Sequence, residues 1–343
     1  MLISKLKELY PIAFIVGFLG MLLIPLRTLA LDPYAIEENF YPRARLIAWT
    51  SNLRLLIGDR VFPKAIAGDD GWLVYTAEGD MEDYQRSALF TREELAQFQQ
   101  NLDALSARYA ERGITLLVIV PPNKNTIYPE RVPPQIPVIG KRTRLDQAVS
   151  YLQAHGNQQI IDLRPALKAA RAEREIYYAT DTHWNDYGAY IAYSALMNEA
   201  GKIHPRVAAH PQTDFKVMTR EPDLLDLSKV MGATLLRESQ IQFAPQFDLR
   251  ANYKTVELGG RRLTFSHIPD SDLPDVVLYY DSFFFSVIPL LGEHFHRGVY
   301  IQNYTGGGLW NLSWVDEREP DVAIIEFAER YLEDLPRFIE PGR

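Results

Sequence analysis

The stretch Val276-Val277-Leu278-Tyr279-Tyr280-Asp281-Ser282-Phe283 combines a continuous apolar run with a serine that follows it almost directly. Such an unbroken run is typical of a strand that a parallel sheet buries on both faces. In open α/β sheets, reactive groups gather where the strands reach their carboxyl ends. The stretch therefore predicts a buried strand over 276–280 that delivers Ser282 to a functional edge. The same serine would also suit the N-cap of a following helix, so the residue by itself leaves both interpretations open.

Apolar strands and amphipathic helices alternate along the rest of the chain. Thr91 and Glu94 form a predicted capping box, and the helix behind it repeats apolar residues at intervals of three and four. Further helices are expected over 145–155, 165–173, 186–200 and 284–295, further strands over 114–120, 159–163, 298–302 and 321–327, and a hairpin near 253–266. This alternation predicts an α/β fold, a sandwich with a mainly parallel sheet, in one domain over 67–343.

A second segment, Thr180-Asp181-Thr182-His183-Trp184-Asn185, carries a carboxylate and an imidazole two residues apart. It stands just before a helical pattern, which Asn185 is well suited to cap. A serine hydroxyl becomes a nucleophile when an imidazole takes its proton and a carboxylate orients that imidazole. Asp181, His183 and Ser282 therefore provide the three parts of a serine-nucleophile site, each at the boundary of an element.

An Asp-x-His pair could also bind a metal ion, but the sequence offers few further ligands. Hard or borderline metals normally take three or four protein ligands. The other histidines show no ligand spacing near His183, and His294 and His296, at the end of a predicted helix, are expected on the surface. We therefore expect neither a metal nor another cofactor.

Composition and charge exclude several classes of function. The formal net charge is -8 at pH 7, whereas nucleic-acid partners select basic surfaces, so no nucleic acid is expected as a partner. The chain has no cysteine, which excludes disulfides, thiolate zinc sites and cysteine nucleophiles.

The amino terminus carries an almost unbroken apolar run over 12–26, with Lys5 and Lys7 before it and Arg27 after it. With its apolar neighbours the run approaches the roughly 20 residues that cross a bilayer, and the basic flank favours a cytoplasmic start. Residues 1–31 are therefore predicted to form an uncleaved membrane helix, with a cleaved signal peptide as the alternative. Either interpretation makes 32–66 a connector, with a short helix over 46–56, and places the body outside the cytoplasm. The anchor would hold it at the inner membrane, in the periplasm.

These motifs resemble the SGNH-hydrolase-like proteins of bacterial exopolysaccharide O-acetylation, whose reference members are the alginate acetylation proteins AlgJ and AlgX. The resemblance rests on the Asp-Thr-His-Trp-Asn segment, its aromatic-Gly-Ala helix start, and the later Asp-Ser-Phe. Other segments agree over about 68–332, namely Gly71-Trp72-Leu73-Val74-Tyr75, Pro121-Pro122-Asn123-Lys124, Asp226-Leu227-Ser228 and Glu329-Arg330. The family places the Asp and His of its triad before the Ser, a permuted order that this sequence keeps. The resemblance implies the SGNH-hydrolase-like form of the three-layer sandwich.

The resemblance implies a catalytic role for each matching triad position. Ser282 would be the nucleophile, His183 the general base and acid, and Asp181 the carboxylate that orients the imidazole. The backbone N–H groups of Ser282 and Phe283 could hold the oxyanion, with an amide donor from Asn303.

Three further positions are expected around this triad. Trp184 would form a wall of the site, and Lys124 would contact substrate or, alternatively, make a structural ion pair. The glycines at 306–308 would belong to an oxyanion loop or to a simple turn.

The implied activity is O-acetyl transfer onto hydroxyls of an exopolysaccharide or cell-envelope glycan through an acetyl-serine intermediate. Exported space lacks acetyl-coenzyme A, so the resemblance implies a multi-pass membrane O-acyltransferase as the partner that supplies acetyl groups. Two alternatives stay open. One is a carbohydrate acetylesterase with the same triad, and the other is a catalytically silent polysaccharide-binding subunit.

Overall fold

The computed structural model describes residues 15–20, 43–258, 260–269, 271–303 and 312–334 of the 343-residue chain. The chain divides into two compact units. The larger unit comprises Val61–Val230 and Leu236–Arg343, and the smaller comprises Met1–Arg60 and Met231–Leu235. The larger unit carries every residue that the sequence assigns to the site.

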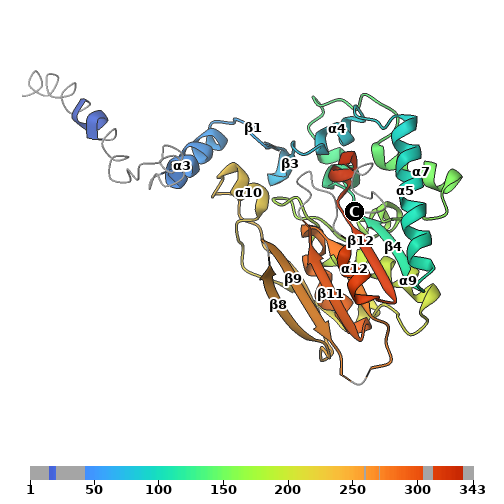
Figure 1. Ribbon diagram of the computed structural model, residues 1–343. Coiled ribbons are helices and arrows are strands. Elements are labelled where there is room, and N and C mark those ends of the chain that lie inside the picture. Colours follow the sequence, from blue (N-terminus) through green and yellow to red (C-terminus); the bar gives the residue numbers. More distant parts are fainter. Residues whose placement is uncertain (1–14, 21–42, 259, 270, 304–311, 335–343) are drawn as a thin grey trace, which may run out of the picture. The chain divides into compact units, whose positions relative to one another are not determined.

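A seven-stranded sheet of the order β5-β4-β12-β10-β11-β9-β8 lies at the centre of the larger unit (Figure 1). The first five strands of this order run parallel, and the hairpin of β8 and β9 continues the sheet with antiparallel pairing. The strands are β4 (Thr115–Val120), β5 (Ile160–Asp162), β8 (Asn252–Leu258), β9 (Arg261–His267), β10 (Val276–Tyr280), β11 (Arg297–Gln302) and β12 (Val322–Glu326). The mainly parallel sheet predicted from the apolar runs is confirmed.

Alternate residues of the central strands enter two separate hydrophobic cores, one on each face of the sheet. Leu278 and Tyr280 of β10 pack into the core that holds α8 and α9, whereas Val277 and Tyr279 pack into the core that holds α5 and α7. All five residues of β10 are buried. Helices thus cover both faces, which makes this unit a three-layer sandwich.

The helices begin at the caps that the sequence indicates. Thr91 and Glu94 form the capping box of α5, Thr143 and Asp146 form another at α7, and the Asn185 side chain accepts the N–H groups of Tyr187 and Gly188 at α9. The α-helices of this unit are α4 (Asp80–Gln85), α5 (Arg92–Ala110), α6 (Lys124–Ile127), α7 (Arg144–His155), α8 (Arg164–Ala170), α9 (Asp186–Ile203), α10 (Asp226–Met231), α11 (Ile288–Leu291) and α12 (Ser313–Arg318).

Two small antiparallel sheets lie outside the main sheet. Strands β1 (Val61–Phe62), β2 (Ala65–Ala67) and β3 (Leu73–Tyr75) form one, and β6 (Phe215–Thr219) pairs with β7 (Ile241–Pro245) in the other. Residues 61–66, expected in the connector, thus belong to a sheet and to the larger unit. Strands β1 and β2 have two and three residues, too few to give a period-two pattern, so the sequence does not reveal them.

The helix expected over 284–295 is wrong, because the chain forms three short turns there. A 3-10 helix spans Ser282–Ser286, α11 follows, and a second 3-10 turn spans Gly292–His294. Pro289 has no N–H to continue the hydrogen-bond ladder, which interrupts the helix. His294, expected on the surface, is 6% exposed and hydrogen-bonded to Tyr193, and burial lowers its pKa to about 3.

The smaller unit contains α3 (Arg43–Leu56), which confirms the helix expected near 46–56. Most of the predicted membrane segment lies outside the described residues, which include only the helical residues 15–20 of it. Among the described residues, no helix is long and apolar enough to cross a membrane.

Candidate active site

Three side chains from two distant segments form a continuous hydrogen-bonded chain at the carboxyl edge of the sheet. Ser282 follows the end of β10, while Asp181 and His183 lie on the loop before α9. His183 Nδ1 lies 2.7 Å from Asp181 Oδ1, and His183 Nε2 lies 2.7 Å from Ser282 Oγ. The structure thus brings together the three residues that the sequence singled out, 99 positions apart in the case of His183 and Ser282.

The turn that carries Ser282 is held by buried polar groups. Asp281 is 5% exposed, and its carboxylate accepts the N–H groups of Phe283 at 2.9 Å and Ala328 at 2.7 Å. The Asp281 N–H donates in turn to Glu326 at the end of β12. Asp281 is therefore the N-cap of the 3-10 helix, which leaves the hydroxyl of Ser282 free to meet the imidazole.

This arrangement changes the expected oxyanion donors. The Phe283 N–H is occupied by the Asp281 carboxylate, so the expectation that it faces an oxyanion is wrong for this conformation. The Ser282 N–H has no acceptor among the described residues. Asn303 directly follows β11, where its N–H donates to the Tyr280 carbonyl, and its amide as an oxyanion donor stays a prediction. The glycines 306–308 lie outside the described residues.

Trp184 packs against the turn that carries Ser282. It is 3% exposed, its Nε1–H donates to the Phe283 carbonyl at 3.0 Å, and its ring stands edge-on to the Phe283 ring. Buried in this way, Trp184 is not the wall facing substrate that was expected. It fixes the position of the backbone next to Ser282.

Lys124 lies under the loop that carries Asp181. Its ammonium is 2% exposed and donates to the carbonyls of Tyr178, Ala179 and Asp181 at 2.7–3.1 Å. All three N–H donors of the ammonium therefore have backbone acceptors, and within the described ranges Lys124 makes no ion pair of the kind expected, while its contact with substrate stays a prediction. Burial lowers the pKa of Lys124 to about 8. The negative charges of nearby carboxylates, first of all Asp181, raise this pKa but do not outweigh burial.

A carboxylate from another part of the chain accepts hydrogen bonds from the same loop. Glu238 accepts the N–H groups of Ala179 and Thr180 and the Thr180 hydroxyl, all at 2.7–2.9 Å. Glu238 was not predicted as a site residue, because nothing in the neighbouring sequence distinguishes it from any other surface glutamate. Lys124 and Glu238 together bond backbone carbonyls and N–H groups of the loop that carries Asp181, and so help to fix its conformation.

The electrostatics of the loop favour an ionised Asp181. Burial opposes its ionisation, but hydrogen bonds and charge from His183, together with the N–H of Asp226, outweigh burial and lower the pKa of Asp181 to about 2. An ionised carboxylate at Nδ1 holds the tautomer that leaves Nε2 free to accept the Ser282 proton.

Asp226 is a second carboxylate at the same imidazole, and the sequence analysis assigned it no role. Its Oδ2 lies 3.5 Å from His183 Nδ1 and accepts the Thr182 hydroxyl at 2.6 Å. Burial, followed by the charge of Asp181, raises the pKa of Asp226 above its ordinary value. The only sequence signal was its segment, which belongs to those that resemble the family.

Ligand atoms of Asp181, His183 and Asp226 all lie within 4.8 Å of one another, a spacing that could accommodate a metal ion. However, His183 Nδ1 and Asp181 Oδ1 already bond each other, the Thr182 hydroxyl donates to Asp226 Oδ2, and the Asp226 N–H donates to Asp181 Oδ2. These contacts fit a hydrogen-bonded dyad better than a ligand set, and the absence of a metal stays a prediction.

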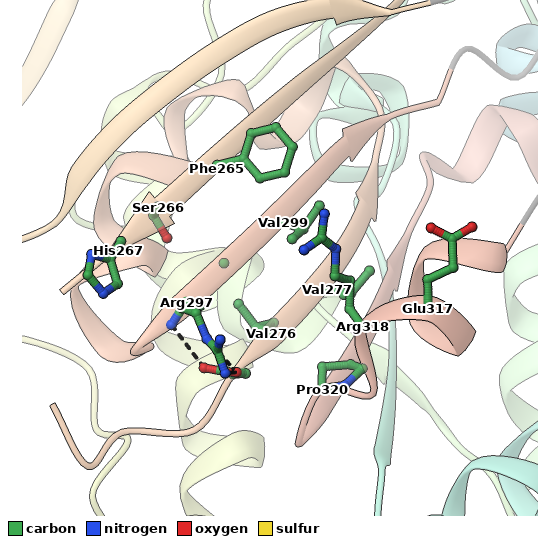
Figure 2. A pocket seen from close by; sticks show the side chains of 12 residues that line it. Phe265, Ser266, His267, Val276, Val277, Arg297, Val299, Glu317, Arg318 and Pro320 are labelled. Atoms are coloured by element: carbon green, nitrogen blue, oxygen red, sulfur yellow. Dashed lines mark hydrogen bonds and ion pairs between the residues drawn. The ribbon is translucent and has the colours of Figure 1, made fainter. Parts of the chain in front are cut away.

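The opposite, amino end of β10 carries a hollow of about 390 Å³, shown in Figure 2. Val276, Arg297 and Arg318 are among its lining residues, and Arg297 donates to the carboxylate of Asp275 there. Three residues of extended strand, at about 3.3 Å each, and Asp281 separate Val277 from Ser282. The hollow is therefore a feature distinct from the triad.

A three-layer α/β fold with a Ser–His–Asp chain at the carboxyl edge of its sheet is an arrangement that the SGNH-hydrolase-like class shares with other serine esterases. Within that class, the family model described as SGNH hydrolase-like domain, acetyltransferase AlgX, matches residues 65–299. The chain belongs to this family.

Two curated relatives share part of the chain. A probable alginate O-acetylase AlgJ of Pseudomonas syringae pv. tomato is 29% identical over 134 residues, which is 39% of this chain and 32% of the relative. A probable alginate O-acetylase AlgJ of Azotobacter vinelandii is 25% identical over 134 residues, 39% of this chain and 33% of the relative. The matched segment thus spans about a third of the length of these relatives.

Solved structures agree with the fold. Bacillus cereus PatB1 aligns with a TM-score of 0.58 and 15% identity over 79% of this chain and 98% of its own. A DHHW family protein from Eubacterium siraeum aligns with a TM-score of 0.56 and 15% identity over 82% of this chain and 100% of its own. The O-acetyltransferase domain of Pseudomonas putida AlgJ aligns with a TM-score of 0.50 and 19% identity over 81% of this chain and 95% of its own. At such identities these likenesses establish the fold alone.

We predict that Gly188→Ala displaces the loop that carries His183. A Cβ at Gly188 would lie 2.4 Å from the Ile176 carbonyl oxygen and 2.7 Å from Trp184 Cβ, so the backbone has to shift. We expect a loss of about 1–3 kcal/mol in the free energy of unfolding, together with a large loss of turnover of an activated acetyl ester. Gly201→Ala is the matched control, because it meets the Val207 carbonyl at 2.6 Å at the other end of α9. Equal activity in the two variants would contradict this prediction.

We predict that Asp226→Asn moves the acidic limb of the pH–rate profile to lower pH, by about one unit. The substitution removes a negative charge that favours the imidazolium, so His183 becomes an active base at lower pH. Rates of ester turnover between pH 4 and 9 would measure the shift. Asp223→Asn, an exposed carboxylate in the same segment, should leave the limb in place. An unmoved limb in Asp226→Asn would show that this carboxylate does not act on the imidazole.

We predict that the buried Lys124 makes stability depend on pH in the alkaline range. Its pKa in the folded state, about 8, lies below the ordinary 10.5, so between these values the unfolded chain binds more protons. The free energy of unfolding of the parent should therefore rise relative to Lys124→Met from pH 8 to 10.5, by on the order of 3 kcal/mol. Denaturant titrations at several pH values measure the difference, with the exposed Lys229→Met as control. A difference that stays constant with pH would be inconsistent with the lowered pKa.

Proposed function

We propose that this protein is an extracytoplasmic O-acetyltransferase that moves acetyl groups onto hydroxyls of an exopolysaccharide or cell-envelope glycan. The observation that carries this proposal is the hydrogen-bonded chain from Asp181 through His183 to Ser282, with both bonds at 2.7 Å. Membership of the AlgX-type acetyltransferase family supports acetyl as the group that is transferred.

The first half-reaction acylates Ser282. His183 Nε2 takes the hydroxyl proton while Oγ attacks the carbonyl carbon of an acetyl donor, which gives a tetrahedral oxyanion. We assign the Ser282 N–H, which has no other acceptor in the described part of the chain, as a donor to that oxyanion. The bond to the leaving group then breaks, and the imidazolium returns its proton to that group.

The second half-reaction transfers the acetyl group. His183 takes the proton of a sugar hydroxyl, whose oxygen attacks the acetyl-serine carbonyl to give a second tetrahedral oxyanion. The bond between the carbonyl carbon and Ser282 Oγ then breaks, and the imidazolium returns its proton to Oγ. Asp181, ionised at neutral pH because of its lowered pKa, stabilises the imidazolium in both halves. Water can replace the sugar as acceptor, and in that case the same residues act as an acetylesterase.

The relatives suggest the substrate by analogy, whereas the partner and the location are proposed from the family resemblance and from the amino-terminal sequence. The curated relatives are named as probable alginate O-acetylases, which supports a polysaccharide as the acceptor. A multi-pass membrane O-acyltransferase would supply acetyl groups, and the apolar run over 12–26 would anchor the protein at the inner membrane with its larger unit in the periplasm.

We predict that the parent protein, incubated briefly with an activated acetyl ester, gains the mass of one acetyl group in intact-protein mass spectrometry. Ser282→Ala should not gain it, because the attacking oxygen is missing. Ser286→Ala, four residues further along the same turn, is the matched control and should acylate like the parent.

Candidate oligosaccharides added to the acetylated protein distinguish the functions. Faster loss of the acetyl group to oligosaccharide than to water supports the transferase, and loss at the rate of hydrolysis alone supports the esterase. Neither acylation nor ester turnover in the parent would point to a polysaccharide-binding subunit and would overturn the proposal.

A further inference from the structure

Helix α3 of the smaller unit carries an exposed apolar stripe. Leu46, Trp49, Leu53 and Leu56 follow one another at intervals of three, four and three residues, which places them on one side of the helix. Their exposed fractions are 47%, 67%, 43% and 74%, and Ile57, directly after the helix, is 74% exposed. A row of large apolar side chains is seldom left in water, so it indicates a surface that meets something apolar.

Another side of the same helix is already in contact with protein. Ser51 Oγ donates to the Met231 carbonyl, and Asn52 bonds both the Thr234 hydroxyl and the Leu235 N–H. These contacts lie within the smaller unit and hold the helix by its polar positions. The apolar stripe is therefore not the face that packs against the segment 231–235.

The charge around the stripe is basic. Residues 43–60 contain four arginines (Arg43, Arg45, Arg54 and Arg60) and one acidic residue (Asp59), a balance of +3 in a chain whose net charge is -8. Arg54 pairs with Asp59, and the balance remains positive. A tryptophan on the apolar side and arginines beside it are the composition of helices that lie at the surface of an anionic membrane.

We propose that α3 lies in the plane of an anionic lipid bilayer surface, with the stripe of Leu46, Trp49, Leu53, Leu56 and Ile57 at the boundary between headgroups and acyl chains. The apolar side chains would enter that boundary by about 5–10 Å, and the arginines would contact lipid phosphates. The apolar run over 12–26 lies a short way upstream in the sequence, which favours lipid over a protein partner as the occupant. The proposal does not depend on the chemistry of the triad.

The chain has no cysteine, so a single introduced thiol can be labelled without background. We would attach a nitroxide at Leu53→Cys on the stripe and, as matched control, at Ala44→Cys on the same helix. The two positions are nine residues apart, two and a half helical turns, and so lie on opposite sides of α3. The full chain would be reconstituted into vesicles of phosphatidylethanolamine with phosphatidylglycerol, and in parallel into phosphatidylcholine vesicles.

We expect the label at position 53 to be severalfold more accessible to oxygen than to a water-soluble nickel chelate, and the label at 44 to show the reverse. The label at 53 should lie deeper in the anionic vesicles than in phosphatidylcholine. Equal access of the nickel chelate to both labels would overturn the proposal, because the stripe would then face water. Protection of position 53 from both reagents would also overturn it, in favour of a protein occupant. Circular dichroism of both labelled variants, compared with the parent, checks that the fold is intact.

Discussion

The buried ammonium of Lys124 is the group on which the candidate site most depends. It stands at the first turn after β4 and bonds three carbonyls of the loop that carries Asp181 and His183. Burying a lone charge is unfavourable, and three carbonyl dipoles, the face of Trp72 at 4.7 Å and nearby carboxylates offset that cost. Because these contacts tie the loop to a strand of the central sheet, the imidazole is held at the edge where β10 ends.

The turn that carries Ser282 depends on a second set of buried groups. Burial, followed by the charge of Asp281, raises the pKa of Glu326 well above its ordinary value, and Glu326 accepts the Asp281 N–H at 2.7 Å. The Arg330 guanidinium lies 5.3 Å from the centre of the Phe283 ring. Polar groups that are already oriented before reaction need little reorganisation when charge develops on the substrate, which suits this turn to acyl transfer.

Local sequence patterns predicted most strands of the parallel sheet and the beginnings of its long helices. The unbroken apolar runs gave the parallel strands, and Thr91 and Asn185 marked the beginnings of α5 and α9. The triad was also predictable, because its residues stand at element boundaries where strand ends meet. The turns over 282–294 were not, since the Asp281 cap and Pro289 outweigh a helical pattern that the apolar residues alone suggest.

The sequence by itself determined the alternation of strands and helices, the identity of the three triad residues and the basic, apolar character of α3, because each is a property of neighbouring residues. Tertiary structure alone decided that Lys124 bonds the carbonyls of the loop and that Asp226 and Glu238 join the site. The physical reason is that a buried donor or acceptor must find a partner wherever the fold brings one. Such partners lie tens or hundreds of residues away, beyond the reach of any local pattern.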